Sequence, residues 1–357
     1  MREKAAWRRK WLRPLGWIYG GASTLRNRMY DASPLSPRPG APYIISVGNI
    51  STGGTGKTPL ASYLLHQALG KGLRPAYLSR GYGRQTSGFY LVFPEPGSTG
   101  KYGDEATLIA SRFPEIPVAV CENRDRGVHL LTQKHELDLI ILDDAFQHRK
   151  VARHLDLVVI DANRLPQEDA MLPAGNLREP IQNLQRADFL IFNKLRNPAS
   201  QVPEIRRLFE PYQKPMAFCF PELEQALPFH PEHPVLTQEA LAGRAVVIFA
   251  GLGNNLYFFD QVEKMGLRLH RSFSYPDHFS FRKSHIFDMI RAWQGLAKAD
   301  RPLLLTTEKD YHRLVGSLDN AIFQDFPFYF LPISLSWIAG EEQVQQLLPA
   351  PPMSASG

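Results

Sequence analysis

Short apolar runs alternate with helical patterns over the first two thirds of the chain. The runs are mostly continuous rather than alternating, and helical patterns lie between most of them. Continuous apolar strands separated by helices are typical of parallel sheets that are covered on both faces. The pattern therefore predicts an α/β domain with strands at 43–47, 74–79, 116–120, 137–143, 155–160 and 188–192.

The pattern changes near residue 218. Residues 218–237 are rich in proline and show no clear period, which indicates a linker, and a second α/β set begins with 244–254. Further strands are expected near 268–274, 302–306 and 327–331. The length of 357 residues also favours two domains, because a single core rarely grows beyond about 300 residues. We predict a basic N-terminal segment, a first domain, a linker, a smaller α/β domain and a disordered tail, at residues 1–30, 31–220, 221–240, 241–348 and 349–357.

Composition and charge narrow the class of protein. The chain is 44% hydrophobic and 21% charged, as soluble globular proteins are, and its net charge of +6 favours an anionic partner. The two cysteines, Cys121 and Cys219, form no CxxC pair, so neither a disulfide framework nor a cysteine-built zinc site is expected, and a reducing cytosol is the simpler compartment. No apolar run reaches the ~18 residues of a spanning helix, and the N-terminus lacks the apolar core of a secretory signal.

The positive charge is concentrated at the N-terminus. Residues 2–28 contain eight Lys or Arg and one acidic residue. Trp7, Trp11 and Ile18 fall near one helical face, and Pro14 can begin a second helical piece. Aromatic side chains beside many cations are typical of segments at the surface of an anionic membrane. The alternative is a terminal helix that docks on the protein's own core and exposes a basic face.

A glycine-rich loop directly follows the first predicted strand. The stretch GNISTGGTGKTPL (48–60) matches the Walker A pattern GxxxxGK[ST], except that Ser51 replaces the first glycine. Small residues let backbone N–H groups point at phosphate, and the following helix N-terminus adds a favourable dipole. We expect Lys57 to reach the β and γ phosphates and Thr58 to offer its hydroxyl to magnesium. The predicted phosphate loop comprises Ser51, Thr52, Gly53, Gly54, Thr55, Gly56, Lys57 and Thr58.

Two acids end the fourth predicted strand, in LDLIILDDAFQH. A Walker B aspartate occupies such a strand end, facing the phosphate loop. We expect Asp143 or Asp144 to hold magnesium while the other orients water or substrate. The sequence does not divide these two functions between them.

Other nucleotide-binding classes fit less well. Guanine-specific proteins carry an NKxD element, and FNKLRN (192–197) supplies Asn193 and Lys194 but Arg196 in place of the aspartate. Partition-type ATPases with a double-glycine loop carry a lysine before the Gly-Gly pair, where this chain has Thr52. A membrane-recruited ATPase switch of the partition type is therefore the second hypothesis rather than the first.

Several stretches are not explained by nucleotide binding alone. They are SRGYGR, GDEATLIA, LPAGNLRE and PDHFSF, at 79–84, 103–110, 172–179 and 276–281. Together with the phosphate loop and DDAFQHR, they resemble the tetraacyldisaccharide 4'-kinases, and the similarity runs from the basic N-terminal segment past TTEKD (306–310). That family also lacks the first glycine of Walker A, whereas Ala145 stands where many relatives have glycine.

The resemblance implies a fold and an activity. The fold is a P-loop NTPase-like parallel-sheet domain with a second, smaller α/β domain. The activity is transfer of phosphate from ATP, with Mg2+, to a tetraacyldisaccharide 1-phosphate precursor of lipid A. The protein would then be peripheral at the cytoplasmic face of the bacterial inner membrane, with its N-terminal segment on the anionic surface. No nucleic-acid recognition module accompanies the basic segment, so no nucleic acid is expected.

The resemblance also implies a catalytic pair. An alcohol acceptor needs a base near the γ-phosphate, and Asp104 is placed as that base. His278 would pair with it, and domain closure would assemble the two. The alternatives are that Asp104 is the N-cap of the helix that follows it and that His278 is a surface loop residue.

Further positions match the family near the phosphates and the acceptor. Arg124 is expected to meet phosphate charge, with a solvated helix face as its alternative. Gln147 follows the Walker B acids with His148, and both are expected to support them. The positions expected near the acceptor are Tyr82, Gln147, Arg178 and Glu179.

Overall fold

The computed structural model describes residues 11–33, 35–295, 302–315 and 321–351, and the chain divides into two units. The first unit takes in Met1–Arg80, Cys121–Pro221 and Leu335–Gly357, and the second takes in Gly81–Val120 and Glu222–Ser334. Each unit is therefore assembled from segments that are far apart in the sequence.

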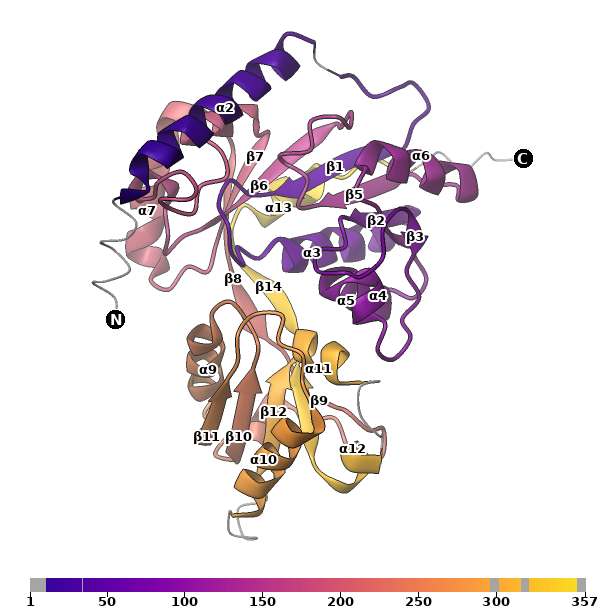
Figure 1. Cartoon of the computed structure of the whole chain (residues 1–357), viewed down its shortest axis with the longest axis vertical. Coiled ribbons are helices and arrows are strands. Elements are labelled where there is room, and N and C mark those ends of the chain that lie inside the picture. The colour runs from indigo at the N-terminus through magenta and orange to yellow at the C-terminus, as the bar shows by residue number, and fades with distance from the viewer. Residues whose placement is uncertain (1–10, 34, 296–301, 316–320, 352–357) are drawn as a thin grey trace. The chain divides into compact units, whose positions relative to one another are not determined.

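A largely parallel sheet forms the centre of the first unit (Figure 1). Its strands are apolar and almost completely buried, as expected when helices cover both faces. The pairs β1–β5, β1–β6, β2–β5, β6–β7 and β7–β8 are all parallel. In spatial order the strands are β14 (Ile333–Ala339), β8 (Met216–Leu223), β7 (Phe189–Asn193), β6 (Leu155–Asp161), β1 (Tyr43–Gly48), β5 (Leu139–Asp143) and β2 (Pro75–Ser79).

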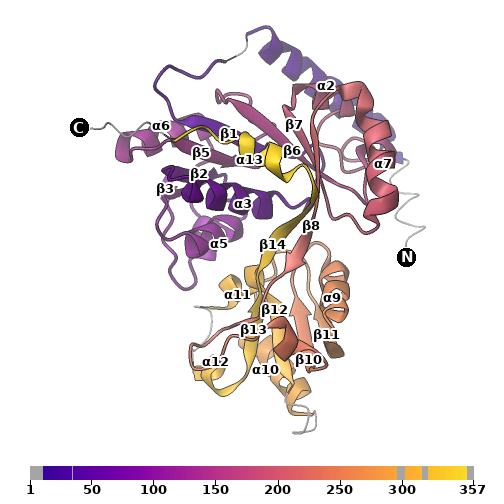
Figure 2. The ribbon, with the colours of Figure 1, turned by 180° about the vertical axis from the view of Figure 1, so that it is seen from behind.

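Helices pack on this sheet through apolar side chains. Helix α3 contacts β1, β2 and β5 (Figure 2). In addition, Tyr63 on α3 donates a hydrogen bond to Glu341 on α13 at 2.8 Å. Strands β6 and β7 share a buried cluster with Ile205 and Phe209 of α7. The helices of this unit are α2 (Arg13–Asp31), α3 (Lys57–Gly70), α6 (Arg124–Lys134), α7 (Pro198–Phe209) and α13 (Glu341–Gln346), with 3-10 turns at Pro166–Glu168, Ile181–Arg186 and Glu210–Tyr212.

Helix α2 buries its small residues and exposes its large apolar ones. Gly16, Gly20, Ser23 and Asn27 face the protein, and a Cβ atom at Gly16 would lie 3.0 Å from the carbonyl oxygen of Met171. The outward side chains of α2 include Leu15, Trp17, Ile18, Leu25 and Met29, all of which are exposed, as is Trp11 just before the helix. Gly16 thus allows a close approach that a side chain would crowd, and the large apolar side chains lie on the solvent side. Pro14 lies in the first turn of α2, as predicted, whereas Trp7 lies outside the described residues.

None of the described helices is both long enough and apolar enough to span a bilayer.

The second unit has its own sheet, in which β10, β11, β12 and β13 are parallel neighbours and β9 is antiparallel. Alternate residues of β10 point to opposite faces, as the pleat requires. Val246 and Ile248 pack with α9, whereas Val247 and Phe249 pack with α10. The strands are β9 (Leu227–Pro228), β10 (Ala245–Ala250), β11 (Arg268–Ser274), β12 (Leu303–Thr307) and β13 (Phe328–Leu331).

Residues 81–120 also belong to this unit. They form the antiparallel pair β3 (Tyr90–Leu91) and β4 (Val118–Val120) and the helices α4 (Thr99–Tyr102) and α5 (Asp104–Arg112). Helix α5 packs against α11. The remaining helices of the unit are α8 (Gln238–Leu241), α9 (Asn255–Lys264), α10 (Lys283–Gln294), α11 (Glu308–Leu314) and α12 (Ala321–Asp325).

The predicted α/β fold is confirmed, and each predicted strand has an observed counterpart that overlaps it. The strands that the pattern did not predict are β3, β8, β9 and β14. Two of these, β3 and β9, are two residues long, too short to carry a period, and β8 contains Pro221 near its end.

Candidate active site

The phosphate loop joins β1 to α3 in a conformation that only glycine adopts easily. Gly53 and Gly56 have φ angles of 103° and 99°. Lys57 begins α3, and no side chain caps the backbone N–H groups of its first turn. A helix N-terminus with open donors is a ready binding place for phosphate.

Two side chains at the end of β7 hold the loop. Asn193, the last residue of β7, donates from Nδ2 to the carbonyl oxygen of Thr55 at 3.0 Å. Lys194 donates from Nζ to the carbonyl oxygen of Gly54 and pairs with Asp161 at 3.0 Å. In the sequence, Asn193 and Lys194 form only an incomplete guanine motif, and no local pattern predicts their contact with the loop.

The predicted Walker B acids lie beside the loop. Asp143 ends β5, and its Oδ2 accepts a hydrogen bond from the hydroxyl of Tyr77 at 2.6 Å. Asp144 lies 3.3 Å from Lys57 Nζ and accepts from Arg178 Nη1 at 2.9 Å. Burial alone would raise the pKa of Asp144, but Lys57 and Arg178 lower it to about 2, so the carboxylate is ionised at neutral pH. The structure thus brings Lys57, Asp144 and Arg178 together.

Arg124 is a buried cation with unused donors. It opens α6, and its Nη1 donates to the carbonyl oxygens of Cys121 and Glu122 at 3.1 and 3.2 Å. Nε and Nη2 are buried and have no hydrogen-bond partner among the described residues. Burial lowers the pKa of Arg124 to about 10, which leaves it charged at neutral pH. Two orphaned guanidinium donors fit an anion such as phosphate, whereas Arg126 is exposed.

The residues after the Walker B acids lie near the start of the phosphate loop and near Arg124. Gln147 donates from Nε2 to the carbonyl oxygen of Asn49, just before the loop, at 2.8 Å. Burial, together with Arg124, lowers the pKa of His148 to about 4, so this side chain is uncharged at neutral pH.

Glu179 holds helix α2. Its side chain is completely buried and accepts hydrogen bonds from Asn27 of α2 at 3.0 Å and from Asn183 at 2.7 Å. Arg186 donates to the same oxygen at 2.5 Å. The Glu179 carboxylate is closed to solvent. Glu179 therefore stabilises the position of α2 and does not lie on an open surface.

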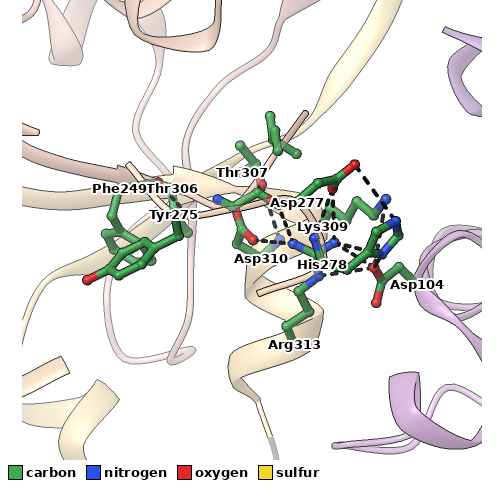
Figure 3. A network of polar contacts seen from close by, with 12 residues as sticks. Asp104, Phe249, Tyr275, Asp277, His278, Thr306, Thr307, Lys309, Asp310 and Arg313 are labelled. Atoms are coloured by element: carbon green, nitrogen blue, oxygen red, sulfur yellow. Dashed lines mark hydrogen bonds and ion pairs between the residues drawn. The ribbon is translucent and has the colours of Figure 1, made fainter. Parts of the chain in front are cut away.

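A second cluster of predicted residues lies within the second unit. His278 Nδ1 lies 2.7 Å from Asp104 Oδ2, and the exposed ring of Tyr82 has its centroid 5.5 Å from that of His278 (Figure 3 shows the pair). Gly103 is the cap residue of α5, and Asp104 makes no capping hydrogen bond, so the N-cap alternative is wrong. The pair is already formed within one unit, which corrects the expectation that domain closure assembles it.

Cations surround the Asp104 carboxylate. Arg313 donates to its Oδ2 from Nε at 3.0 Å and from Nη2 at 2.6 Å, and Lys309 Nζ lies 3.7 Å away. Burial would raise the pKa of Asp104, but the hydrogen bonds from His278 and Arg313 hold it well below its ordinary value. Neither Lys309 nor Arg313 is predicted as a site residue from the sequence. Lys309 lies in the TTEKD stretch, which the family resemblance covers without implying a function for it.

Within the described residues, no group of three or more His, Cys, Asp or Glu side chains is arranged to hold a metal ion. A magnesium ion that accompanies a nucleotide needs fewer protein ligands, because phosphate oxygens and water complete its shell. The oxygen donors at the end of β5 and the start of α3 are sufficient for that arrangement.

Comparisons with known proteins agree with one another. The family described as Tetraacyldisaccharide-1-P 4'-kinase matches residues 8–350. A protein of Chlorobaculum parvum named tetraacyldisaccharide 4'-kinase is 35% identical over 94% of this chain and 93% of its own length. One of the same name from Chlorobium chlorochromatii is 34% identical over 95% and 92%. The crystal structure of LpxK from Aquifex aeolicus, determined with ATP, is 30% identical, with a TM-score of 0.73 over 95% of this chain and 98% of that one.

Proposed function

The chain belongs to the tetraacyldisaccharide-1-P 4'-kinase family, and we propose that it transfers the γ-phosphate of ATP to the 4'-hydroxyl of a tetraacyldisaccharide 1-phosphate. The product is a 4'-phosphorylated precursor of lipid A. Membership makes the chain an ATP-dependent kinase, and the residues below are our assignment of its steps.

One observation carries the proposal. Lys57 is the first residue of α3, whose N-terminus has open donors, and its Nζ lies 3.3 Å from the ionised Asp144. Backbone donors, a lysine and a carboxylate at one strand end are what a nucleoside triphosphate with its metal requires. We assign Lys57 to the β and γ phosphates and the buried, unpaired donors of Arg124 to phosphate charge. Asn193 and Lys194 keep the loop in shape.

The residues at this strand end fit Mg2+. Carboxylate and hydroxyl oxygens are its preferred ligands, and the Asp144 side chain is 38% exposed. Thr58, Asp143 and Asp144 would hold the ion, which supplies charge neutralisation to the phosphates when bound.

We propose that Asp104 accepts the proton of the acceptor hydroxyl and that His278 orients the carboxylate. A positioned base contributes about 10²–10⁴-fold to a reaction of this kind. The exposed Tyr82 next to His278 is our candidate contact for the sugar, together with Gln147 and Arg178. Glu179 contributes indirectly, by holding α2 next to Arg178.

We further propose that the outward face of α2 binds the membrane that carries the lipid substrate. Its exposed apolar side chains are accompanied by Arg13, Arg26 and Arg28, and the one acidic residue of the helix is Asp31. This combination suits the anionic cytoplasmic face of the bacterial inner membrane, with the protein peripheral to it.

The test is transfer of label from γ-labelled ATP to tetraacyldisaccharide 1-phosphate in mixed micelles with Mg2+. We expect label on the lipid, and a loss of at least about 10²-fold in Lys57→Met, because the γ-phosphate loses its positioning. Lys264→Met, on the exposed surface of α9, is the matched control and should retain activity. If ATP hydrolysis is robust and independent of the lipid, and no label reaches the lipid, the result would favour a membrane-recruited ATPase switch instead.

A further inference from the structure

The TTEKD segment ends β12 and begins α11, and its polar side chains point back into the second unit. Thr307 accepts a hydrogen bond from the backbone N–H of Asp310 at 3.1 Å, and its hydroxyl donates to Asp310 Oδ2 at 2.8 Å. The same Oδ2 accepts from the backbone N–H of Gly251 at 2.9 Å. Asp310 is completely buried, and these two donors fix its carboxylate in place.

Asp310 in turn fixes Arg313, one turn further along α11. Arg313 Nη1 donates to Asp310 Oδ1 at 2.8 Å and to the carbonyl oxygen of Gly251 at 2.6 Å. The Arg313 side chain is only 6% exposed. Its remaining edge, Nε and Nη2, faces Asp104 (Figure 3). The guanidinium is therefore held at one edge and presents the other to α5.

All donors that reach Asp104 converge on one oxygen. His278 Nδ1 and Arg313 Nε and Nη2 contact Oδ2, and Lys309 Nζ is nearest to the same atom. Oδ1 has no hydrogen-bond partner among the described residues, and it is not among their fully enclosed, unpaired atoms. The carboxylate thus has one oxygen committed to cations and one left to accept.

We propose that Arg313 is a positioning residue for phosphoryl transfer: held by Asp310, it fixes the Asp104 carboxylate so that Oδ1 receives the proton of the acceptor hydroxyl. This inference rests on the proposed function, in which Asp104 is the base. It adds Arg313 as the residue that orients the Asp104 carboxylate, and it gives the TTEKD segment a function, because Asp310 of that segment holds Arg313.

The charges around Asp104 predict a pH effect. Lys309, Arg313 and His278 face the carboxylate, and the acids in the same cluster are Glu105, which binds Lys309, and Asp277, which lies 3.7 Å from Arg313. His312 follows Lys309 on α11, and burial lowers its pKa to about 4, so it adds no charge at neutral pH. Arg313 is one of the groups that lower the pKa of Asp104. Removing its charge must raise that pKa, so the carboxylate takes up a proton at higher pH than before.

The experiment compares four variants in the full chain, two of them at Arg313. Arg313→Met should lower kcat by roughly 10- to 100-fold, because a misdirected base loses its alignment, while KM for ATP stays near the parent value. The acid limb of its kcat profile should move to higher pH. Arg313→Lys restores the charge but not the two-point contact, so its acid limb should stay near the parent's while kcat remains low.

Arg112→Met is the matched control. Arg112 binds Glu308 from Nε at 2.8 and 3.0 Å, so it links α5 to α11 without touching Asp104. It should lower the melting temperature without moving the acid limb. If Arg112→Met reproduces both the kcat loss and the pH shift, Arg313 acts only through packing of the two helices and the inference is overturned.

Asp104→Asn separates this inference from the proposed function. If Asp104→Asn remains active, the assignment of the base fails. If Asp104→Asn is inactive but Arg313→Met keeps the parent's kcat and pH profile, the base stands and the positioning by Arg313 is wrong. Should Arg313→Met not fold, Arg313→Lys decides alone: a parent-like kcat would contradict the two-point contact.

Discussion

Left-handed backbone angles gather at residues of the two candidate sites. Among the described residues other than glycine, φ is positive at Asp144, Lys194, Gln213 and His278. Three of these four belong to the strand end of the phosphate loop or to the Asp104 cluster. Such angles cost about 1–3 kcal/mol each and persist only where the surroundings hold them. Here the holding contacts are visible as the bonds to Arg178, Gly54 and Asp104.

Two glycines of the phosphate loop offer a test of steric fit at this scale. A Cβ atom at Gly56 would lie 1.9 Å from Asn193 Nδ2, whereas one at Gly53 would have no atom within 4 Å. Both have similar positive φ angles, so Gly53→Ala reports backbone strain alone. We expect Gly56→Ala to weaken ATP binding at least about tenfold more than Gly53→Ala, since it must also displace the Asn193 brace. Calorimetric titration with ATP measures both, and equal losses would show that the brace is unimportant.

Helix α2 shows how an element can satisfy two surroundings at once. Small residues let it lie close to the segment around Met171, and Asn27 reaches the buried Glu179. Large apolar side chains are kept for the other face. Deleting the helix would uncover Glu179 and its partners, so the loss of membrane binding could not be separated from a loss of stability.

Substitutions on the outward face of α2 avoid that difficulty. The triple variant Ile18→Ser, Leu25→Ser, Met29→Ser should reduce co-sedimentation with anionic vesicles by far more than tenfold, since each buried apolar side chain contributes about 1.5–3 kcal/mol. The control is Val235→Ser, Leu256→Ser, Phe287→Ser, which removes exposed apolar side chains from the second unit. Unchanged sedimentation of the α2 variant, or equal losses in both, would place the membrane contact elsewhere.

At the scale of the whole molecule, the two units are interleaved in sequence. Residues 81–120 supply α5 to the second unit, where Arg112 meets Glu308 and Asp104 meets Arg313. A fragment of residues 241–348 would leave these α11 side chains without partners, at about 1–3 kcal/mol for each buried group. Against a total stability of about 5–15 kcal/mol, that is a large loss.

We therefore expect the 241–348 fragment to lack a cooperative thermal transition by circular dichroism. A second fragment, in which residues 81–120 are joined to residues 222–334 by a Gly-Ser linker, should show a cooperative transition. A cooperative transition in the shorter fragment, at the temperature of the longer one, would show that α5 contributes little to the unit.

The sequence predicts local features of this molecule well and long-range ones poorly. Most strands of both sheets follow from continuous apolar runs, Lys57 follows from the glycine-rich loop pattern, and Asp143 and Asp144 follow from their position at a strand end. The pairing of Asp104 with Arg313 leaves no local trace, because the two are 209 residues apart. The contact of Asn193 with the phosphate loop likewise leaves no local trace, because the sequence around Asn193 shows only an incomplete guanine motif.

That separation has a consequence for synthesis on the ribosome. At about 5–20 residues per second, Asp104 is synthesised roughly 10–40 s before Arg313. During that interval α5 carries an acidic first turn, Asp104 and Glu105, whose cations have not been made. The nascent helix is then open to wrong partners, including the cationic N-terminal segment already synthesised. The cluster around Asp104 can therefore assemble only after Arg313 has been synthesised, and the chain must stay soluble until then.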